Sequence, residues 1–268
     1  MSWISVVAAL LCAGLAAVIA RLALRGRSRQ TSHYAGLWLV LAGLLFTGAQ
    51  QFVTPALQAR YDASRVDDSL SSHAAFAAIK KHDPQTYGRI MAELREGLLA
   101  GQSQGVLIER VRAQVTSLVQ QRLPRASDEA AIEYLRVMVQ EMQELRGHGG
   151  DLCFRFLFPQ PGESLSLTRH VSANIRDADA AALSQVVRSS TVSPQPVPQK
   201  AEVQPRMQPV MAALSARYGP DLALLERPQT PGIDRDKLCS INIDLYSVIL
   251  QMPPNDGGKL IRYLMSQS

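Results

Sequence analysis

The chain has 268 residues, of which 47% are hydrophobic and 19% are charged, and it carries a formal net charge of +5. Residues 1–57 contain four arginines and no Asp or Glu, so the rest of the chain holds 24 basic side chains against 23 acidic ones. A nearly neutral remainder has no general positive field that could gather phosphates, and nucleic acid is therefore excluded as the expected partner.

Two uncharged, largely apolar stretches occupy residues 1–20 and 34–59. A helix rises about 1.5 Å per residue, so about 20 such residues cover a hydrocarbon core of about 30 Å. The fold predicted for residues 1–59 is a transmembrane helical hairpin with a short connecting loop. The whole chain is then embedded in a membrane through its N-terminal segment.

The connection between the two stretches is strongly basic. Short basic loops stay in the cytoplasm, which places both termini on the other side of the membrane. A cleaved signal peptide is the alternative, but it needs basic residues before the apolar run, and here they follow it. We therefore expect a bacterial inner-membrane protein whose residues 60–268 form a periplasmic domain. The residues that determine this topology are Arg21, Arg25, Arg27 and Arg29.

The periplasmic part, residues 60–268, is predicted to be all-α and to form a helical bundle, as one domain or two. A helix is expected from about Ser71 to Lys81, a second after the N-cap Asp83, a third over 105–123 and a fourth opened by Ser127. Apolar residues recur at helical spacing in the last three and predict their buried faces. These residues are Ile90, Leu94 and Leu98; Leu107, Val111, Val115, Leu118 and Val119; and Ile132, Leu135, Val139 and Met142.

The next segment breaks the helical pattern, because Phe154, Phe156 and Phe158 stand at alternate positions. This spacing fits a short strand or an extended segment that plugs the helical array, with Cys153 as its tether. We prefer the plug, since the chain offers little for a strand to pair with.

Helical pattern resumes over residues 167–188, and a proline-rich loop is predicted near residues 189–205. Two helical hairpins follow, with turns at residues 218–220 and 253–258. The second of these turns contains the glycines of "PNDGGK", which lacks the preceding strand and the spacing of a phosphate-binding loop.

The three cysteines differ in their surroundings. Cys12 lies in the first apolar stretch and is expected to be a packing residue. Cys153 and Cys239 lie in the periplasmic part and are the candidate pair for a disulfide, with two buried free thiols as the alternative. A nucleophilic Cys153 assisted by His148 is a further, less favoured alternative.

No residues form a recognisable catalytic, cofactor-binding or metal-binding pattern. His73, His82, His148 and His170 lack the spacing of a zinc site. Two sets of glutamates could supply the carboxylate pair of a cell-wall hydrolase, but basic neighbours on amphipathic helices favour solvated ion pairs. These sets are Glu93, Glu96 and Glu109, and Glu129, Glu133 and Glu141.

The expected function is therefore binding without catalysis, and without a cofactor, by a domain held at the periplasmic face of the membrane. The favoured hypothesis is an immunity protein that neutralises a periplasm-acting bacterial toxin. The alternative is an accessory or sensor subunit of an envelope or secretion assembly, and a cell-wall hydrolase is less favoured. In the first two cases the partner is a protein, either a toxin or a subunit of an envelope complex.

Overall fold

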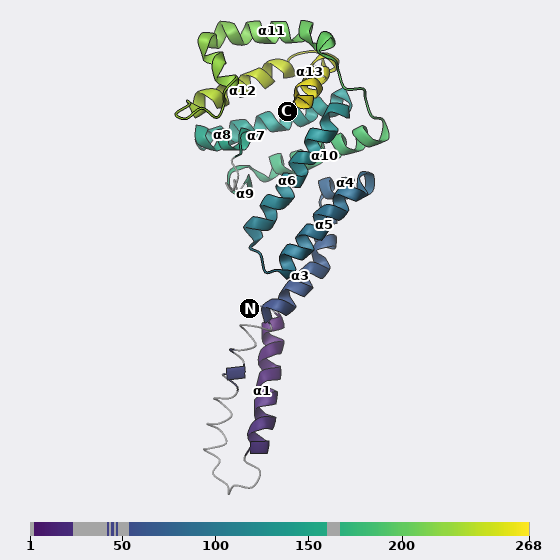
Figure 1. Ribbon diagram of the computed structural model, residues 1–268, viewed down its shortest axis with the longest axis vertical. Helices are drawn as coiled ribbons and strands as arrows, with labels where there is room; N and C mark the ends of the chain where they lie inside the picture. The colour runs from purple at the N-terminus through teal and green to yellow at the C-terminus, as the bar shows by residue number, and fades with distance from the viewer. Residues whose placement is uncertain are drawn as a thin grey trace. The chain divides into compact units, whose positions relative to one another are not determined.

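The computed structural model describes residues 3–23, 42, 44–45, 47, 54–159 and 167–267. These residues form α-helices and short 3-10 helices joined by turns, and they contain no strand (Figure 1). The all-α prediction is confirmed for the described part of the chain.

The N-terminal helix α1, Trp3–Ala23, covers the first apolar stretch. Most of the second stretch lies outside the described residues, as do Arg25, Arg27 and Arg29, and the side chain of Arg21 is likewise not described. Helix α3, Thr54–Ser71, starts within that stretch and continues past residue 60. Among the described residues, none of the helices combines the length and the apolar character that crossing a membrane requires. The hairpin part of the predicted fold is thus not supported.

The chain divides into two compact units. The first comprises Met1–Asp67 with Met91–Leu107, and the second comprises Asp68–Ile90 with Ile108–Ser268. Helices α5, Pro84–Leu99, and α6, Gln104–Arg122, each contribute to both units.

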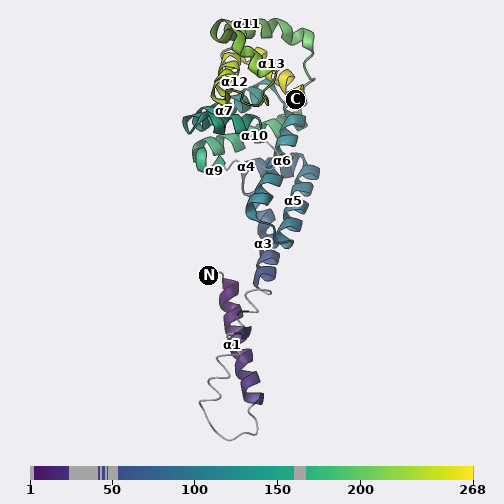
Figure 2. The same ribbon diagram turned by 60° about the vertical axis from the view of Figure 1, so that its left-hand side comes forward.

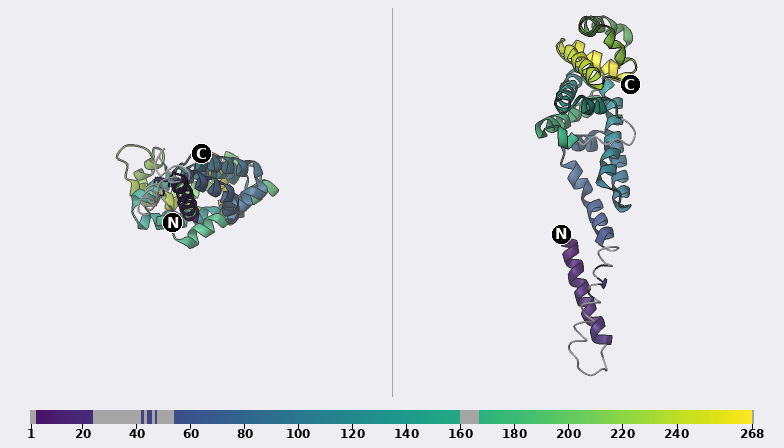
Figure 3. Two further views of the ribbon diagram at one scale, coloured as in Figure 1. Left: turned by 90° about the horizontal axis from the view of Figure 1, so that it is seen from below. Right: turned by 90° about the vertical axis from the view of Figure 1, so that its left-hand side faces the viewer.

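The second unit is a helical array drawn in blue to yellow in Figures 1 and 2. Its central helix is α7, Asp128–Gly147. Four helices pack against α7 (Figures 1 and 3): α8, Gly150–Leu157; α10, Ala173–Val192; α12, Arg235–Leu250; and α13, Pro254–Ser266. The other elements that lie wholly in this unit are α4, Ala74–His82; η2, Leu123–Arg125; α9, Leu167–His170; α11, Lys200–Tyr218; and η3, Gly219–Leu225.

Two predicted helix starts are confirmed by their capping bonds. The backbone N–H of Thr86 donates to Asp83 Oδ1 at 3.1 Å, and that of Ala130 donates to Ser127 Oγ at 3.2 Å. Each bond satisfies an amide that has no partner inside its helix. The predicted apolar face of α7 is buried at all four of its positions, Ile132, Leu135, Val139 and Met142.

The disulfide predicted between Cys153 and Cys239 is present, with the two Cα atoms 6.0 Å apart. It joins α8 to α12 across 86 residues, and both cysteines are fully buried. In the chain-entropy account, closing a loop of this length stabilises the folded state by about 4.5 kcal/mol. The surrounding core contains Val139, Met142, Leu145, Val171 and Ile243.

The extended plug predicted around the three phenylalanines is wrong, because Gly150–Leu157 is helical. Gly149, with φ of 131°, turns the chain out of α7, and α8 then packs against α7 and α12. Phe154 and Phe158 belong to the alternating pattern, but they are also four residues apart, which is the spacing of neighbours on a helix. Their ring centroids lie 5.3 Å apart. Both Cys153 and Phe154 are buried in the helical conformation, and this burial overrides the local period of two.

The proline-rich loop is shorter than the predicted 189–205, since only residues 193–199 lie between α10 and α11. Helix α11 starts at Lys200 with a capping box between Gln199 and Glu202, and it accommodates Pro205 and Pro209. The predicted helix over 167–188 is also divided, into α9 and α10.

The C-terminal hairpins are only partly as predicted. Helices α12 and α13 form the second hairpin, but η3 takes the place of the second helix of the first. The residues of the predicted turn from Pro254 to Gly258 form the first turns of α13 instead.

Candidate functional site

A surface hollow of about 460 Å³ lies beside the disulfide, between α8 and the segment that leads into α12. It combines apolar walls with one cation. The residues that line it are Phe154, Pro228, Gln229, Thr230, Pro231, Gly232, Ile233 and Arg235.

Arg235 and Phe154 form the centre of this hollow. The guanidinium carbon of Arg235 lies 4.7 Å from the centroid of the Phe154 ring, and the guanidinium also pairs with Asp151. Phe154 is buried, whereas about half of the Arg235 side chain is exposed. The ring and the Asp151 carboxylate together orient the arginine, and its guanidinium remains partly exposed to solvent.

The positions of both residues follow from the disulfide. Cys153 directly precedes Phe154, and Cys239 follows Arg235 by four residues on the same face of α12. The two helix starts also approach closely, because a Cβ on Gly150 would lie 2.7 Å from the Cα of Asp236. The covalent bond and this glycine contact together fix Arg235 over Phe154.

The wall of the hollow is a compact loop before α12. Two backbone bonds shape it, from Thr230 N–H to the Arg227 carbonyl and from Ile233 N–H to the Thr230 carbonyl, both at 3.2 Å. Gly232 has a φ of 78°, a conformation that favours glycine. Arginine and aromatic side chains dominate the energy of many protein interfaces, so this hollow can accept an apolar side chain with an acidic neighbour.

The next observations concern the residues considered as a nucleophile or as metal ligands. Cys153 cannot act as a nucleophile while its sulfur is bonded to Cys239. The structure brings His148 and His170 together, with ring centroids 5.6 Å apart. No cluster of three or more His, Cys, Asp or Glu suited to a metal ion occurs in the part of the chain that the structure describes.

The glutamates predicted to form solvated ion pairs include one exception. Glu133 pairs with Arg136, and Glu109 lies 3.9 Å from Arg112, as expected. Glu141, in contrast, is only 5% exposed. The prediction is wrong for Glu141 because it lies one turn from Leu145 on the buried side of α7.

The carboxyl group of Glu141 lies in a cluster of ionisable groups that was not predicted from the sequence; Glu141 is buried, and its neighbours Asp179 and Tyr134 are partly buried. Burial raises its pKa, the charge of Asp179 on α10 raises it further, and Arg112 partly offsets both effects. Burial also raises the pKa of Asp179. The pKa of Tyr134 is raised by burial and then by the two acids. The sequence signal was the position of Glu141 between Met138 and Leu145 at heptad-like spacing.

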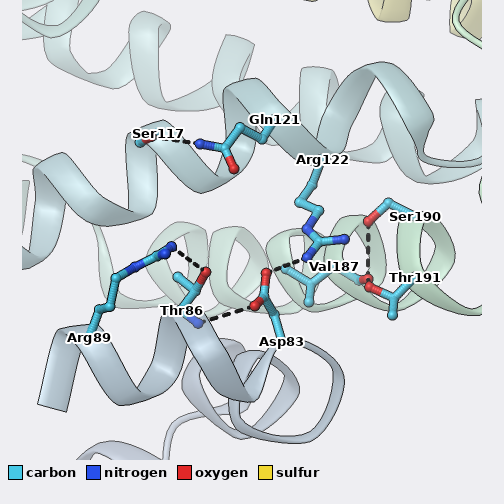
Figure 4. Close-up of polar contacts among 9 residues, drawn as sticks. All are labelled: Asp83, Thr86, Arg89, Ser117, Gln121, Arg122, Val187, Ser190 and Thr191. Atoms are coloured by element: carbon cyan, nitrogen blue, oxygen red, sulfur yellow. Dashed lines mark hydrogen bonds and ion pairs between the residues drawn. The ribbon is translucent and has the colours of Figure 1, made fainter.

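A second polar cluster lies where the corner between α4 and α5 meets the end of α6 (Figure 4). Arg122 donates to Asp83 Oδ2, and Arg89 donates to Thr86 Oγ1 at 2.9 Å. Burial acts to raise the pKa of Asp83, but the bonds from Arg122 and Thr86 outweigh it and hold the pKa below its ordinary value. These groups satisfy one another, which marks the cluster as a clamp between helices.

Comparisons of the chain with protein-family models, with curated proteins and with solved structures find no match.

Proposed function

We propose that the chain is a non-enzymatic binding protein anchored in the inner membrane of a bacterium, with residues 60–268 in the periplasm. The specific role proposed is that of an immunity protein, which binds and neutralises a toxin that acts in the periplasm. Its anchor keeps the binding domain concentrated at the surface to be protected.

The Cys153–Cys239 disulfide is the observation that carries the proposal. Disulfides form and persist in oxidising compartments such as the periplasm and are rare in the cytosol. The bond is fully buried and cross-links the core around α7, α8 and α12, so it belongs to the stable fold of the domain. A domain stapled in this way suits a protein that folds after export.

The proposed anchor rests on the N-terminal sequence and on the surface of α1. Residues 1–20 contain no charge, and four arginines follow them. Among the described side chains of α1, six large aliphatic ones are exposed, a pattern typical of a helix surrounded by lipid or by other helices. These side chains are Val6, Leu10, Leu11, Leu15, Val18 and Ile19.

The hollow beside the disulfide supports the binding role. Arg235 presents an accessible charge, and the neighbouring prolines, Ile233 and Phe154 supply apolar surface. A toxin whose active surface offers an apolar side chain beside a carboxylate would be occluded by docking there.

The test is a growth competition between cells that lack the gene and their parent strain, in contact on a solid surface. The proposal predicts that the deletion strain is killed and that a plasmid copy protects it. Arg235→Glu should abolish protection because it reverses the charge at the hollow, whereas Arg136→Glu, on the exposed face of α7, should preserve it. Equal survival of the deletion strain and its parent would rule out the immunity role.

The accessory or sensor subunit remains the competing proposal, and an anchor exchange separates the two. Residues 1–59 are replaced by an unrelated transmembrane hairpin of the same topology. An immunity domain should still protect, because its anchor only holds it at the membrane. An assembly subunit should fail, because it uses its own membrane helices to contact other subunits.

A further inference from the structure

The turn between α5 and α6 carries exposed aliphatic side chains on both of its sides. Leu99, the last residue of α5, is 58% exposed, and Val106, in the first turn of α6, is 45% exposed. No charged residue occurs in residues 97–108, although charged residues bracket this run at 95–96 and 109–110. The end of this helical hairpin is therefore neutral and apolar.

Two carbonyl groups at the end of α5 are hydrogen-bonded within the turn. The N–H of Gln102 donates to the Gly97 carbonyl at 2.9 Å, and that of Gly101 donates to the Leu98 carbonyl at 3.1 Å. Gly101 has a φ of 67°, so α5 ends in a Schellman motif. Carbonyls that are already bonded do not need water, which lowers the cost of moving the turn into a less polar medium.

Exposed apolar side chains are unevenly distributed between the two units. Of the thirteen large hydrophobic residues that are exposed among those described, ten belong to the first unit, which contains both α1 and this turn. On the surfaces of soluble proteins, exposed large hydrophobic residues are usually single and scattered. Their concentration in the unit that holds the N-terminal helix indicates a common apolar environment for that unit.

We propose that the α5–α6 turn, residues 97–107, inserts into the interfacial layer of the membrane, as a second lipid contact beside the N-terminal anchor. The inference rests on the anchor in the proposed function. Lipid is the occupant that fits, because the turn offers aliphatic groups without the arginine or aromatic anchors that specify a protein partner.

The experiment places an environment-sensitive fluorophore on single cysteines in the full chain. The background is Cys12→Ala, and Cys153 and Cys239 remain bonded to each other. Leu99→Cys and Val106→Cys report on the turn, Leu10→Cys reports on α1, and Val192→Cys, 68% exposed in the second unit, is the control. Each protein is reconstituted into phosphatidylethanolamine and phosphatidylglycerol vesicles that carry a quencher near the headgroups.

The inference predicts that quenching at positions 99 and 106 is several-fold stronger than at position 192. Quenching at 99 and 106 no stronger than at 192 overturns it. If position 10 is then quenched by a deeper probe, the anchor stands and only the contact by the turn is wrong. If position 10 is not quenched at any depth, the anchor of the proposed function fails as well.

Discussion

Glu141 is an acid held inside a helical core, and its surroundings determine how it responds to pH. Burial is the main cause of its raised pKa, and Asp179 on α10 raises the pKa further. Arg112 on α6 lowers it in part, and Glu144 on α7 raises it slightly. Glu144 is itself engaged, because its Oε2 accepts bonds from the N–H and hydroxyl of Ser172 at 3.0 and 3.1 Å. The folded state therefore favours the neutral form of Glu141.

The pH dependence of stability follows from this preference. Below the ordinary carboxyl pKa of 4.5, Glu141 is protonated in the folded and unfolded chain alike, and folding carries no penalty. As the pH rises, the unfolded chain ionises while the folded chain resists ionisation, so stability falls. Glu141→Gln should raise the free energy of unfolding by more than about 1 kcal/mol at about pH 8 and leave it nearly unchanged at about pH 4, below the ordinary pKa of the carboxyl group.

Urea unfolding of both proteins at the two pH values measures this effect. Glu133→Gln is the matched control, because it changes a partly exposed glutamate on the same helix. It should change the free energy by less than about 1 kcal/mol at either pH. An equal effect of Glu141→Gln at both pH values would contradict the assigned environment.

Arg262 is a second buried charge, and it connects three segments. Its side chain is 3% exposed and donates to the Pro124 carbonyl at 3.1 Å, to Asp128 Oδ1 at 2.7 Å, and to the Pro196 carbonyl. The guanidinium thus joins α13 to η2, to the start of α7, and to the loop between α10 and α11.

Truncation of Arg262 should be strongly destabilising. Arg262→Ala leaves a carboxylate and two carbonyls without their donor, and we expect a loss of about 3–5 kcal/mol. Arg206→Ala removes a more exposed pair with Asp256 and should cost about 1 kcal/mol or less. Chemical denaturation of the two variants compares them directly, and equal losses would show that Arg262 contributes no more than a surface pair.

At the level of elements, α13 approaches α7 more closely than ordinary side chains permit. A Cβ on Gly258 would lie 2.6 Å from the Cα of Asp128 and 2.8 Å from its carbonyl oxygen. A Cβ on Gly257 would lie 2.8 Å from the Ile249 carbonyl oxygen. At both positions the clashing atoms include backbone atoms, which cannot move without displacing a helix.

Gly258→Ala is expected to lower the free energy of unfolding by about 1–3 kcal/mol, as overpacked sites do. Gly88→Ala is the control, because nothing lies within 4 Å of a Cβ placed there in the exposed middle of α5. It should stabilise the protein by about 0.5–1 kcal/mol through helix propensity. Thermal unfolding gives both signs, and stabilisation by Gly258→Ala would refute the close contact.

Those glycines also illustrate what the sequence can and cannot reveal. Local signals predicted the caps at Asp83 and Ser127, the apolar face of α7, and the cysteine pair, because each depends on neighbouring residues or on simple chemistry. The glycines at positions 257 and 258 were predicted to form a turn. In the structure they lie in α13 and allow close packing against other helices, which a local sequence pattern cannot indicate. In the same way, α8 is helical although its phenylalanines alternate in the sequence, because its side chains are buried against other helices.

The candidate site was predictable only in part. The sequence indicated Cys153 and Cys239, but not that their bond would place Arg235 over the Phe154 ring, since this follows from how α8 and α12 meet. The burial of Glu141 depends on α10, which a heptad-like position alone does not specify. The candidate site forms where two segments joined by a disulfide across 86 residues come together.

At the scale of the whole molecule, three features have one explanation in common. A buried disulfide staples the second unit, exposed aliphatic side chains concentrate in the first, and the arginines of the sequence follow an uncharged N-terminal stretch. Each is explained if the chain is anchored by its N-terminal segment and the disulfide-bonded domain lies outside the cytoplasm. That placement is the central claim, and the binding role depends on it.

The most direct test is labelling of single cysteines in spheroplasts with a membrane-impermeant maleimide, in a Cys12→Ala background. Val192→Cys reports on the proposed periplasmic domain, and Ser28→Cys reports on the proposed cytoplasmic loop. The account predicts that position 192 is labelled in intact spheroplasts and position 28 only after lysis. Labelling of position 192 only after lysis would place the domain in the cytoplasm and contradict both the proposed topology and the neutralisation of a periplasmic toxin.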